Sequence, residues 1–520
     1  MRNGAERMKL RVKILGINAG DKPIAVLHED DAEDLGIRSL GRVLIKHEGK
    51  TSVAILNTTK RIVGRGEVGI FDEIVEDMEL KEGAGVDVVV SEFPNSISHI
   101  KAKLQGRRLT YDELLEIVKD TVDNKLNEIE LTSFVTALNN FGLDLEESVS
   151  MTKAMVETGK QLKFNNAYIV DKHSIGGVPG DKTSLLLVPI IAACGLTIPK
   201  TASRAITSAA GTADRAEVFM PVDLNIEEMK TVVKRAGGCI VWGGTLELAP
   251  ADDIFIRIEY PMSIDPLMIP SIMSKKKAVG AEYLVIDIPC GRGTKVKTIG
   301  DANLLAKDFI EMGKRLGIKT ECAVTYGEQP IGYTIGPALE AREALEVIMR
   351  KRNVPDLIDK VKHIAKMLLE MVGKDGEKLV NEALKSGKAE EKLRQIIFEQ
   401  GGDEEIQPED IEIGKYGIDI HADRKGYVLW MNNHQLAAIA RAAGAPKDKK
   451  AGILLYKKIG DRAEKDEKLF TIYADKPRKL KRAQSVLAEE KAVGVDERRE
   501  MLIHEVKEHP MHKKSFILER

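Results

Sequence analysis

The 520-residue sequence has few aromatic side chains, few cysteines and no excess of either charge. Aromatic residues make up 4% of the chain, which argues against a surface that stacks sugars or exposed nucleic-acid bases. The 79 Lys and Arg residues nearly balance the 81 Asp and Glu residues, giving a formal net charge of −2. Nucleic acid and anionic membranes are therefore not expected partners, and any site for an anion must be local.

The four cysteines (Cys194, Cys239, Cys290 and Cys322) are scattered and show no CxxC spacing. This pattern excludes a zinc ribbon or a disulfide scaffold and favours the reducing cytoplasm. The longest apolar run, 185–196, contains Pro189 and is too short to span a bilayer. The N-terminal residues lack the apolar core of a secretion signal, and Met8 offers an alternative start. We expect a cytoplasmic protein without a bound metal or cofactor.

Periodicity divides the chain. Alternation over 9–15 and short apolar segments between glycines predict strands, whereas the capping-box residues Thr110 and Glu113 begin a run of amphipathic helices. Apolar strands then alternate with helices, as in a mostly parallel sheet. Four parts are expected: an N-terminal small β-barrel-like domain over 1–92, a helical domain over 95–165 (a contribution from part of 190–240 is left open), a central α/β catalytic domain over 166–400, and a C-terminal α+β domain over 410–520.

A glycine-rich segment, 171–184, follows an apolar strand candidate and leads into an apolar helix. Gly177 allows the backbone to approach a ligand closely, and amides at a helix N-terminus favour an anion. Lys172, Ser174 and Ser184 add a positive charge and hydroxyl donors. The segment is a candidate phosphate loop; the alternative is an ordinary glycine-rich turn between a strand and a helix.

Small and hydroxyl-bearing residues crowd into a second segment, 200–215. Such residues can surround an oxyanion with hydroxyl groups and amides. The candidate ligand-binding residues here are Ser203, Arg204, Ala205, Ile206, Thr207, Ser208 and Thr212. The alternative is a Ser/Thr-rich turn that caps a helix at Thr212.

Two further motifs follow later strands and helices. The turn 290–295 places Arg292 and Lys295 at the carboxyl end of a strand, where open α/β sheets bind ligands, although a solvated basic turn is the alternative. Asp265 lies among apolar residues, so we expect burial to raise its pKa above about 3.9 and let it carry a proton near neutrality. The alternative role for Asp265 is to cap the turn before Pro266.

Together these motifs resemble the nucleoside phosphorylase II family, which includes thymidine and pyrimidine-nucleoside phosphorylases and has anthranilate phosphoribosyltransferase as a distant relative. The segment 171–177 is close to the phosphate loop of that family, 203–212 matches its second loop, and 271–276 matches its base-side helix. The resemblance extends over about residues 95–500. It implies a homodimer or a larger homo-oligomer with dimer contacts in the helical domain.

The departures from the thymidine phosphorylase pattern resemble the archaeal AMP phosphorylase branch of the family. The second loop has no His before Gly211, the later turn is basic, and an N-terminal β domain is present. This resemblance implies that inorganic phosphate and AMP, with CMP and UMP left open, give a free base and ribose 1,5-bisphosphate, as in nucleotide salvage and degradation. Asp265 would donate a proton to the leaving base.

The attacking phosphate and the 5′-phosphate are two anionic groups, and the residues offer two clusters for them. Lys172, Ser174 and Ser184 can serve the attacking phosphate, and the loop 203–212 with Lys295 can serve the 5′-phosphate. By resemblance, Gly177 would approach the ligand and Ser271 would contact the 5′-phosphate or the sugar. Arg257 and Lys275 occupy base-side positions in the relatives. His173 is expected to order the loop or touch phosphate.

Three other functions remain open at this point. A pyrimidine-nucleoside (thymidine) phosphorylase would share the fold. A phosphoribosyltransferase would need magnesium near a pyrophosphate, for which Asp252 and Asp253 are the suggestive pair, although we interpret them as a helix start. A non-catalytic nucleotide-binding protein would bind AMP without releasing adenine.

Overall fold

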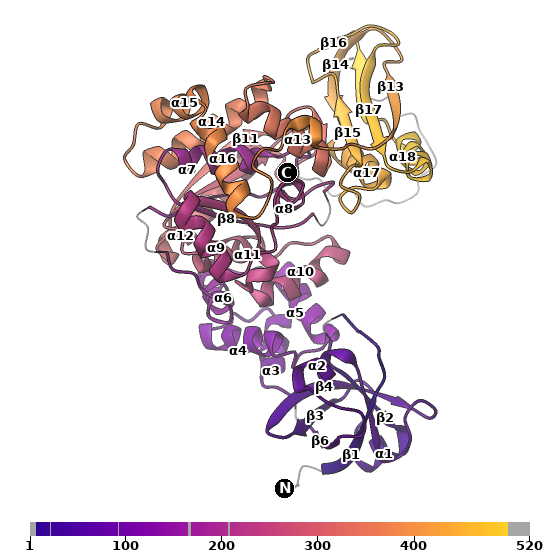
Figure 1. Ribbon diagram of the computed structural model, residues 1–520. Coiled ribbons are helices and arrows are strands. Elements are labelled where there is room, and N and C mark those ends of the chain that lie inside the picture. The colour runs from indigo at the N-terminus through magenta and orange to yellow at the C-terminus, as the bar shows by residue number, and fades with distance from the viewer. Residues whose placement is uncertain (1–6, 21, 92, 165–167, 206–207, 498–520) are drawn as a thin grey trace, which may run out of the picture.

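The computed structural model describes residues 7–20, 22–91, 93–164, 168–205 and 208–497. Figure 1 shows a barrel at the N-terminal end, a helical layer next to it, a central α/β body and a separate C-terminal body at the opposite end. The architecture is thus the mixed α/β arrangement of several units that the sequence predicts. No helix in the described ranges is both long enough and apolar enough to cross a membrane.

The N-terminal strands close into a barrel in the order β1-β5-β2-β4-β3-β6, with alternate side chains such as Leu27 and Ile45 filling its interior. Closure leaves no free sheet edge along these strands. The predicted barrel-like domain is confirmed, although β2 and β5 were not recognised in the sequence. Its elements are β1 (Arg7–Ile14), β2 (Ile24–His28), α1 (Glu29–Asp34), β3 (Arg42–His47), β4 (Lys50–Thr59), β5 (Glu67–Ile70), α2 (Asp72–Met78) and β6 (Gly85–Val90).

A helical layer follows, and its predicted capping box is present: Thr110 and Glu113 satisfy each other's backbone donors at the start of α4. A later helix, α10, completes the core of this layer, where the rings of Phe134 and Phe255 lie 5.9 Å apart. Helices that precede the central strands are thereby joined to one that lies between two of them in the chain. The helices are α3 (Ser96–Leu104), α4 (Tyr111–Val122), α5 (Glu128–Phe141), α6 (Leu145–Glu157) and α10 (Pro250–Met262).

The central strands are parallel. β10 pairs with β7 on one side and β11 on the other, β8 pairs with β9, and a parallel bridge from Ile169 to Thr197 links the two groups. Their carboxyl ends therefore share one edge, from which the candidate phosphate loop, the second loop and the basic turn emerge. The strands are β7 (Val170–Ser174), β8 (Ile198–Ala202), β9 (Gly238–Trp242), β10 (Tyr283–Cys290) and β11 (Lys319–Tyr326).

Strand β7 corrects one expectation. The sequence suggested a strand that ends at Val170 and a loop that begins at Asp171, but Asp171 to Ser174 continue the strand and pair with β10. The candidate phosphate loop consequently begins at Ile175. Lys172 and His173 are held by strand hydrogen bonding rather than by a flexible turn.

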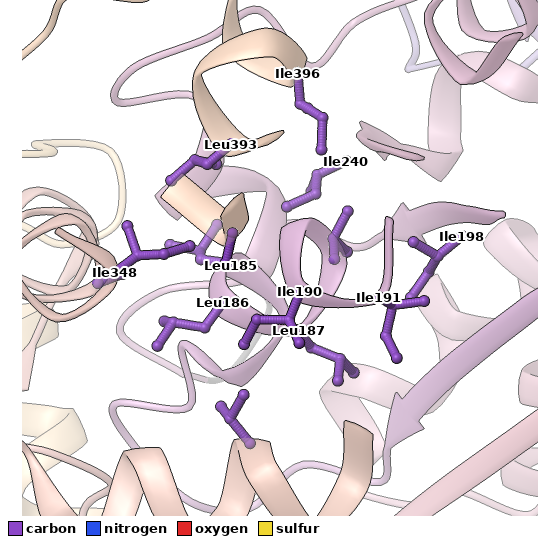
Figure 2. Packing of buried hydrophobic residues seen from close by; sticks show 14 of the residues in the cluster. Leu185, Leu186, Leu187, Ile190, Ile191, Ile198, Ile240, Ile348, Leu393 and Ile396 are labelled. Atoms are coloured by element: carbon purple, nitrogen blue, oxygen red, sulfur yellow. The ribbon is translucent and has the colours of Figure 1, made fainter. Parts of the chain in front are cut away.

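Helix α7 (Thr183–Ala193) is buried on all sides and forms the centre of the α/β body. Figure 2 shows its leucines and isoleucines packed among Ile198, Ile240, Ile348, Leu393 and Ile396. The start of α7, directly after the candidate phosphate loop, is thereby fixed against a large core. The other helices of this body are α8 (Thr212–Ala216), α9 (Ile226–Ala236), α11 (Met268–Ala278), α12 (Ile299–Leu316), α13 (Pro337–Ile348), α14 (Pro355–Met371), α15 (Gly376–Ser386) and α16 (Lys388–Glu399), with short 3₁₀ turns at Gly243–Leu246 and Pro408–Asp410.

The C-terminal body is an α+β unit joined to the centre by a strand. β12 pairs with β15 in the sheet β12-β15-β17-β13, and a second sheet has the order β16-β14-β18. The unit is therefore tied to the chain segment that follows β11. Its elements are β12 (Thr334–Ile335), β13 (Tyr416–His421), β14 (Gly426–Met431), α17 (Asn433–Ala443), β15 (Gly452–Leu455), β16 (Arg462–Ala463), β17 (Lys468–Ala474), α18 (Pro477–Glu489) and β18 (Val493–Asp496).

The packing of the core around α7 leads to a prediction about stability. Leu187 is fully buried there, so Leu187→Ala leaves a cavity and should lower the free energy of unfolding by about 2–5 kcal/mol. Leu304→Ala is the matched control because Leu304 is exposed on α12. Thermal and urea unfolding measure both variants; equal midpoints for the two would contradict the central role of this core.

Candidate active site

The candidate phosphate loop and the basic turn 290–295 meet at the carboxyl edge of the sheet. Gly177 has a φ of +93°, and a Cβ added to it would lie 3.1 Å from the backbone nitrogen of Lys295. Gly180 is equally restricted, since an added Cβ would lie 2.5 Å from the carbonyl oxygen of Ile331. The glycines are therefore needed for close backbone packing. The candidate phosphate loop and the basic turn, more than a hundred residues apart in the chain, lie against each other.

Lys295 extends the contact to Asp265. Its Nζ lies 2.8 Å from Oδ2 of Asp265, and both side chains are nearly half exposed (47% and 43%). The expectation of a poorly hydrated Asp265 is therefore wrong. Its apolar neighbour in the sequence, Leu267, turns into the core of the helical layer, whereas the Asp265 carboxylate reaches the basic turn.

The sequence led us to expect a buried carboxyl group with a raised pKa at Asp265. That group is instead Glu259 on α10. The residue is only 5% exposed. Burial, followed by the negative charges of Asp265 and Asp252, raises the pKa of Glu259 to about 8. At neutral pH this side chain is thus mainly protonated.

Beneath the loop, Asp171 binds two buried lysines. Its Oδ2 lies 2.6 Å from Nζ of Lys276 and its Oδ1 lies 3.4 Å from Nζ of Lys200. Burial opposes ionisation of Asp171, but the two lysines outweigh it and keep the pKa of this carboxyl below its usual range. Burial also lowers the pKa of Lys200 to about 7, against the opposing attraction of Asp171. Lys200 is therefore only about half protonated at neutral pH, and Asp171 balances much of the positive charge of this cluster.

Lys172 belongs to a neighbouring ion network. Its Nζ lies 3.5 Å from Asp287 and 3.6 Å from Asp181, and Nζ of Lys360 lies 2.7 Å from Asp287. Burial opposes ionisation of Asp181, but Lys172 and Lys360 outweigh it and hold the pKa of Asp181 well below its usual range. The picture of Lys172 as a free cation in a loop is corrected: it is a buried lysine whose charge is partly balanced by aspartates.

The two candidate serines lie on either side of the loop. The Ser174 hydroxyl oxygen accepts a hydrogen bond from the amide of Gly176 at 3.4 Å. Ser184 is buried in the first turn of α7. Both serines border the glycine-rich backbone. Their assignment to phosphate stays a prediction.

His173 lies among the same positive charges. Burial first, and then Lys276 and Lys200, lower the pKa of His173 well below its usual value. The imidazole is therefore neutral at neutral pH. This state excludes a role as a charged proton donor and is compatible with the predicted role in ordering the loop or touching phosphate.

Arg204 in the second loop is already engaged. Its guanidinium donates to Glu217 at 2.7 Å and to Asp223 at 3.1 Å, and it lies 4.9 Å from the ring centroid of Trp242. The hydrogen bond to Glu217 is the largest of the effects that raise the pKa of Arg204. The prediction of Arg204 as a cation available to a ligand is therefore corrected, because these carboxylates balance its charge.

The rest of this loop folds back on itself. The amide of Ala205 donates to Asp214, and the Ser208 hydroxyl donates to the carbonyl of Ala210, whereas Ser203 is exposed. Gly211, not Thr212, is the N-cap of α8, and Thr212 is its first residue, which corrects the predicted cap. Ile206 and Thr207 lie outside the described residues.

The base-side candidates converge on Asp252. The Ser271 hydroxyl donates to Oδ2 of Asp252 at 2.9 Å, and Nζ of Lys275 lies 2.6 Å from the same oxygen. Asp252 is in the first turn of α10, as the predicted helix start requires, but it is fully buried and orients both α11 side chains. Arg292 does not join them; its guanidinium lies 5.8 Å from the ring centroid of Trp430 in the C-terminal body.

Sequence reasoning missed the buried charges that support the loop. These residues are Lys200, Lys276, Asp181, Asp287, Lys360 and Glu259. A signal existed for some of them, because Lys200 and Asp287 are charged residues that interrupt apolar strands. Charges in such positions are rarely buried without a partner. Their partners come from distant segments, so only the folded chain identifies them.

Comparison with known proteins places the chain in a family. Residues 97–159 match the helical bundle domain and residues 166–390 the a/b domain of the glycosyl transferase family, and 427–493 match the pyrimidine nucleoside phosphorylase C-terminal domain. The fold is similar to that of the anthranilate phosphoribosyltransferase from Thermus thermophilus, with a TM-score of 0.50 and 18% identity over 58% of this chain and 98% of that one. The fold and the site thus define a glycosyl transferase with a phosphorylase C-terminal domain.

Curated relatives give a narrower family. The AMP phosphorylase of Thermofilum pendens is 46% identical over 99% of this chain and 100% of its own length. The AMP phosphorylases of Thermococcus kodakarensis and Methanocaldococcus jannaschii are 49% and 46% identical over 92% and 91% of this chain, and 95% of each relative is covered. The chain belongs to the AMP phosphorylase family.

Lys200 provides a test of the buried charges. The pKa of Lys200 is near 7 in the folded chain, whereas an ordinary lysine has a pKa of 10.5. Between pH 7 and 10.5 the unfolded chain therefore binds more protons at this residue than the folded chain does. The free energy of unfolding consequently rises with pH in this range. The contribution of one group is at most about 1.4 kcal/mol per pH unit. Lys200→Met should lack this rise, whereas Lys277→Met, at an exposed position of α11, should keep it. Thermal midpoints from pH 7 to 9 measure the difference; parallel curves for wild type and Lys200→Met would refute the shift.

Proposed function

We propose that this protein catalyses the phosphorolysis of AMP, with CMP and UMP as further candidate substrates, to a free base and ribose 1,5-bisphosphate. The observation that carries the proposal is the contact of the Gly177 loop with Lys295, which in turn pairs with Asp265. The glycine-loop backbone, which is suited to an anion, thereby lies next to a cation, Lys295, and a carboxyl group, Asp265. The names of the curated relatives agree with this activity.

The attacking phosphate would bind at the glycine loop. Gly176 and Gly177 both have positive φ values, and successive amides in such a turn can converge on an anion. Lys172, Lys200 and Lys276 lie beneath in buried positions, where aspartates balance part of their charge. Ser174 and Ser184 flank the loop. In the reaction, a phosphate oxygen would form the new bond to C1′ of the ribose as the bond from C1′ to the base nitrogen breaks.

Lys295 is suited to recognise the 5′-phosphate because its ion pair with Asp265 is exposed. Exposed pairs contribute about 0–1 kcal/mol, so a phosphate dianion can compete with Asp265 for the ammonium group. When Lys295 turns to the substrate, the Asp265 carboxyl group is released from the ion pair. Asp265 is the candidate donor of a proton to the leaving base.

The 203–212 loop and Ser271 complete the proposal. The backbone and hydroxyl groups of Ser203, Ser208 and Thr212, rather than the engaged Arg204 guanidinium, would contact the nucleotide. Ser271 and Lys275, oriented by Asp252, would face the sugar and base. We further propose a homodimer or a larger homo-oligomer, because Ile129 and Phe141 of the helical layer are exposed and apolar. We also propose that the protein acts in the cytoplasm.

The substrate assay decides among the competing functions. Incubation of AMP with phosphate should release adenine and a doubly phosphorylated ribose, and the same assay with CMP and UMP defines base preference. Uridine and thymidine should react poorly, since they lack the 5′-phosphate. Faster reaction of these nucleosides would favour a pyrimidine-nucleoside phosphorylase. Binding of AMP without release of adenine would indicate a nucleotide-binding protein.

Asp265→Asn tests the proton donor. The amide keeps the size of the side chain but cannot donate a proton in the same way, so turnover should fall by about 10²–10⁴-fold while AMP binding remains. Single-turnover kinetics and calorimetric titration with AMP separate these effects. Unchanged turnover would remove Asp265 from this role.

Lys295→Ala tests recognition of the 5′-phosphate. A hydrogen bond to a charged group contributes about 1.5–3 kcal/mol, so KM for AMP should rise by about 10–100-fold and KM for adenosine much less. Arg292→Ala is the matched control from the same turn, since Arg292 lies against Trp430. Equal effects of Lys295→Ala on both substrates would show that Lys295 does not recognise the phosphate.

A further inference from the structure

Lys458 joins the C-terminal body to the segment that follows β11. The residue lies between β15 and β16 and is only 7% exposed. Its ammonium group donates to the carbonyl oxygens of Pro330 and Gly332, and its Nζ lies 2.8 Å from Oδ2 of Asp356. These acceptors use all three N–H donors of a lysine. Lys458 is therefore engaged in holding this segment and is not available to a ligand.

Ile331, between the two bound carbonyl groups, contacts the candidate phosphate loop. Its amide donates to the carbonyl of Pro179 at 3.0 Å, and its own carbonyl accepts a hydrogen bond from Nζ of Lys182 at 2.8 Å. A Cβ added to Gly180 would lie 2.5 Å from the same carbonyl oxygen, so the two backbones pack closely. A shift of Ile331 must therefore displace this half of the loop, which leads into α7.

The contacts of Lys458 are polar in a place where an apolar side chain could fill the same space. A buried ammonium group needs such a set of acceptors to offset its lost hydration. Asp356, at the start of α14, also accepts the amide of Gly332 at 3.0 Å. An apolar side chain would leave the two carbonyl groups without a donor, whereas the lysine fixes where both of them lie.

We propose that Lys458 is a positioning residue for the attacking phosphate: it fixes the backbone at 330–332 and, through Ile331, sets the shape of the glycine loop at 179–182. The proposal rests on the proposed function, in which this loop binds inorganic phosphate. Lys458 itself touches neither substrate. The C-terminal body thereby contributes to phosphate binding through the backbone of another part of the chain, whereas recognition of the 5′-phosphate by Lys295 depends on it much less.

Kinetic constants for the two substrates test this role. In Lys458→Met the two carbonyl groups lose their donor, and KM for inorganic phosphate should rise by about 10–100-fold, because a displacement of about 1 Å remote from the reacting atoms can cost that much. KM for AMP should stay near the wild-type value. Lys465→Met, at an exposed position between β16 and β17, is the matched control and should change neither constant. Equal rises in both KM values, or an unchanged KM for phosphate, would overturn the proposal.

A double variant separates lost positioning from lost stability. Lys458→Met alone leaves the buried carboxylate of Asp356 without its cation, which is destabilising. Adding Asp356→Asn removes the unbalanced charge and keeps an oxygen that can accept the amide of Gly332. The thermal midpoint should therefore recover, whereas KM for phosphate should remain raised. Recovery of both quantities would mean that Lys458 acts through stability only, and the positioning role would be rejected.

Binding of inorganic phosphate can also be measured without turnover. Phosphate added in the absence of AMP should raise the thermal midpoint of the wild-type chain, and the double variant should need about tenfold more phosphate for the same rise. Coinciding titrations, or a wild-type midpoint that does not respond to phosphate, would contradict the role of Lys458. If wild type binds phosphate but releases no adenine from AMP, the proposed function fails, and the two titrations alone decide whether Lys458 positions the loop.

Discussion

Asp171 and its two lysines unite the elements on which the site depends. Asp171 comes from β7, Lys200 from β8 and Lys276 from α11, so one buried carboxylate links two strands of the central sheet to a helix beside the helical layer. Neither lysine nor the aspartate can be buried alone without a large cost, which makes the three groups mutually dependent. Because β7 leads into the glycine loop and α11 carries Ser271 and Lys275, this interaction also sets the distance between the two sides of the candidate site.

The electrostatics of the site divide into a buried part and an exposed part. The buried lysines are paired with aspartates, whereas the pair of Lys295 and Asp265 is open to solvent and can be exchanged for a ligand charge. In the proposed function the first group would serve one anion and the second group the other. The proposed reaction uses two separate anions, inorganic phosphate and the 5′-phosphate of AMP, and a chain that is nearly neutral overall must bind them by such local charges.

Packing between distant segments gives the loops their shape. Gly177 lies against Lys295, Gly180 against Ile331, and Asn433 of the C-terminal body donates to the carbonyl of Gly327 at 2.8 Å. Each of these loops at the sheet edge therefore has a neighbour from another part of the chain. A change in the packing of the C-terminal body would reach the basic turn through Arg292 and Trp430 without any contact to the substrate.

The sequence by itself determined what depends on local pattern: the barrel strands with period two, the capping box at Thr110, the alternation of strands and helices, and the glycines of the phosphate loop. It also identified Asp265 and Lys295 as candidates, but not their pairing. Tertiary structure decided which charges are buried, because burial depends on neighbours far away in the chain. Asp265, surrounded by apolar residues in the sequence, is exposed in the fold, whereas Glu259, in an ordinary helical segment, is buried and protonated; side-chain environment follows from packing in space and not from the nearest residues in the sequence.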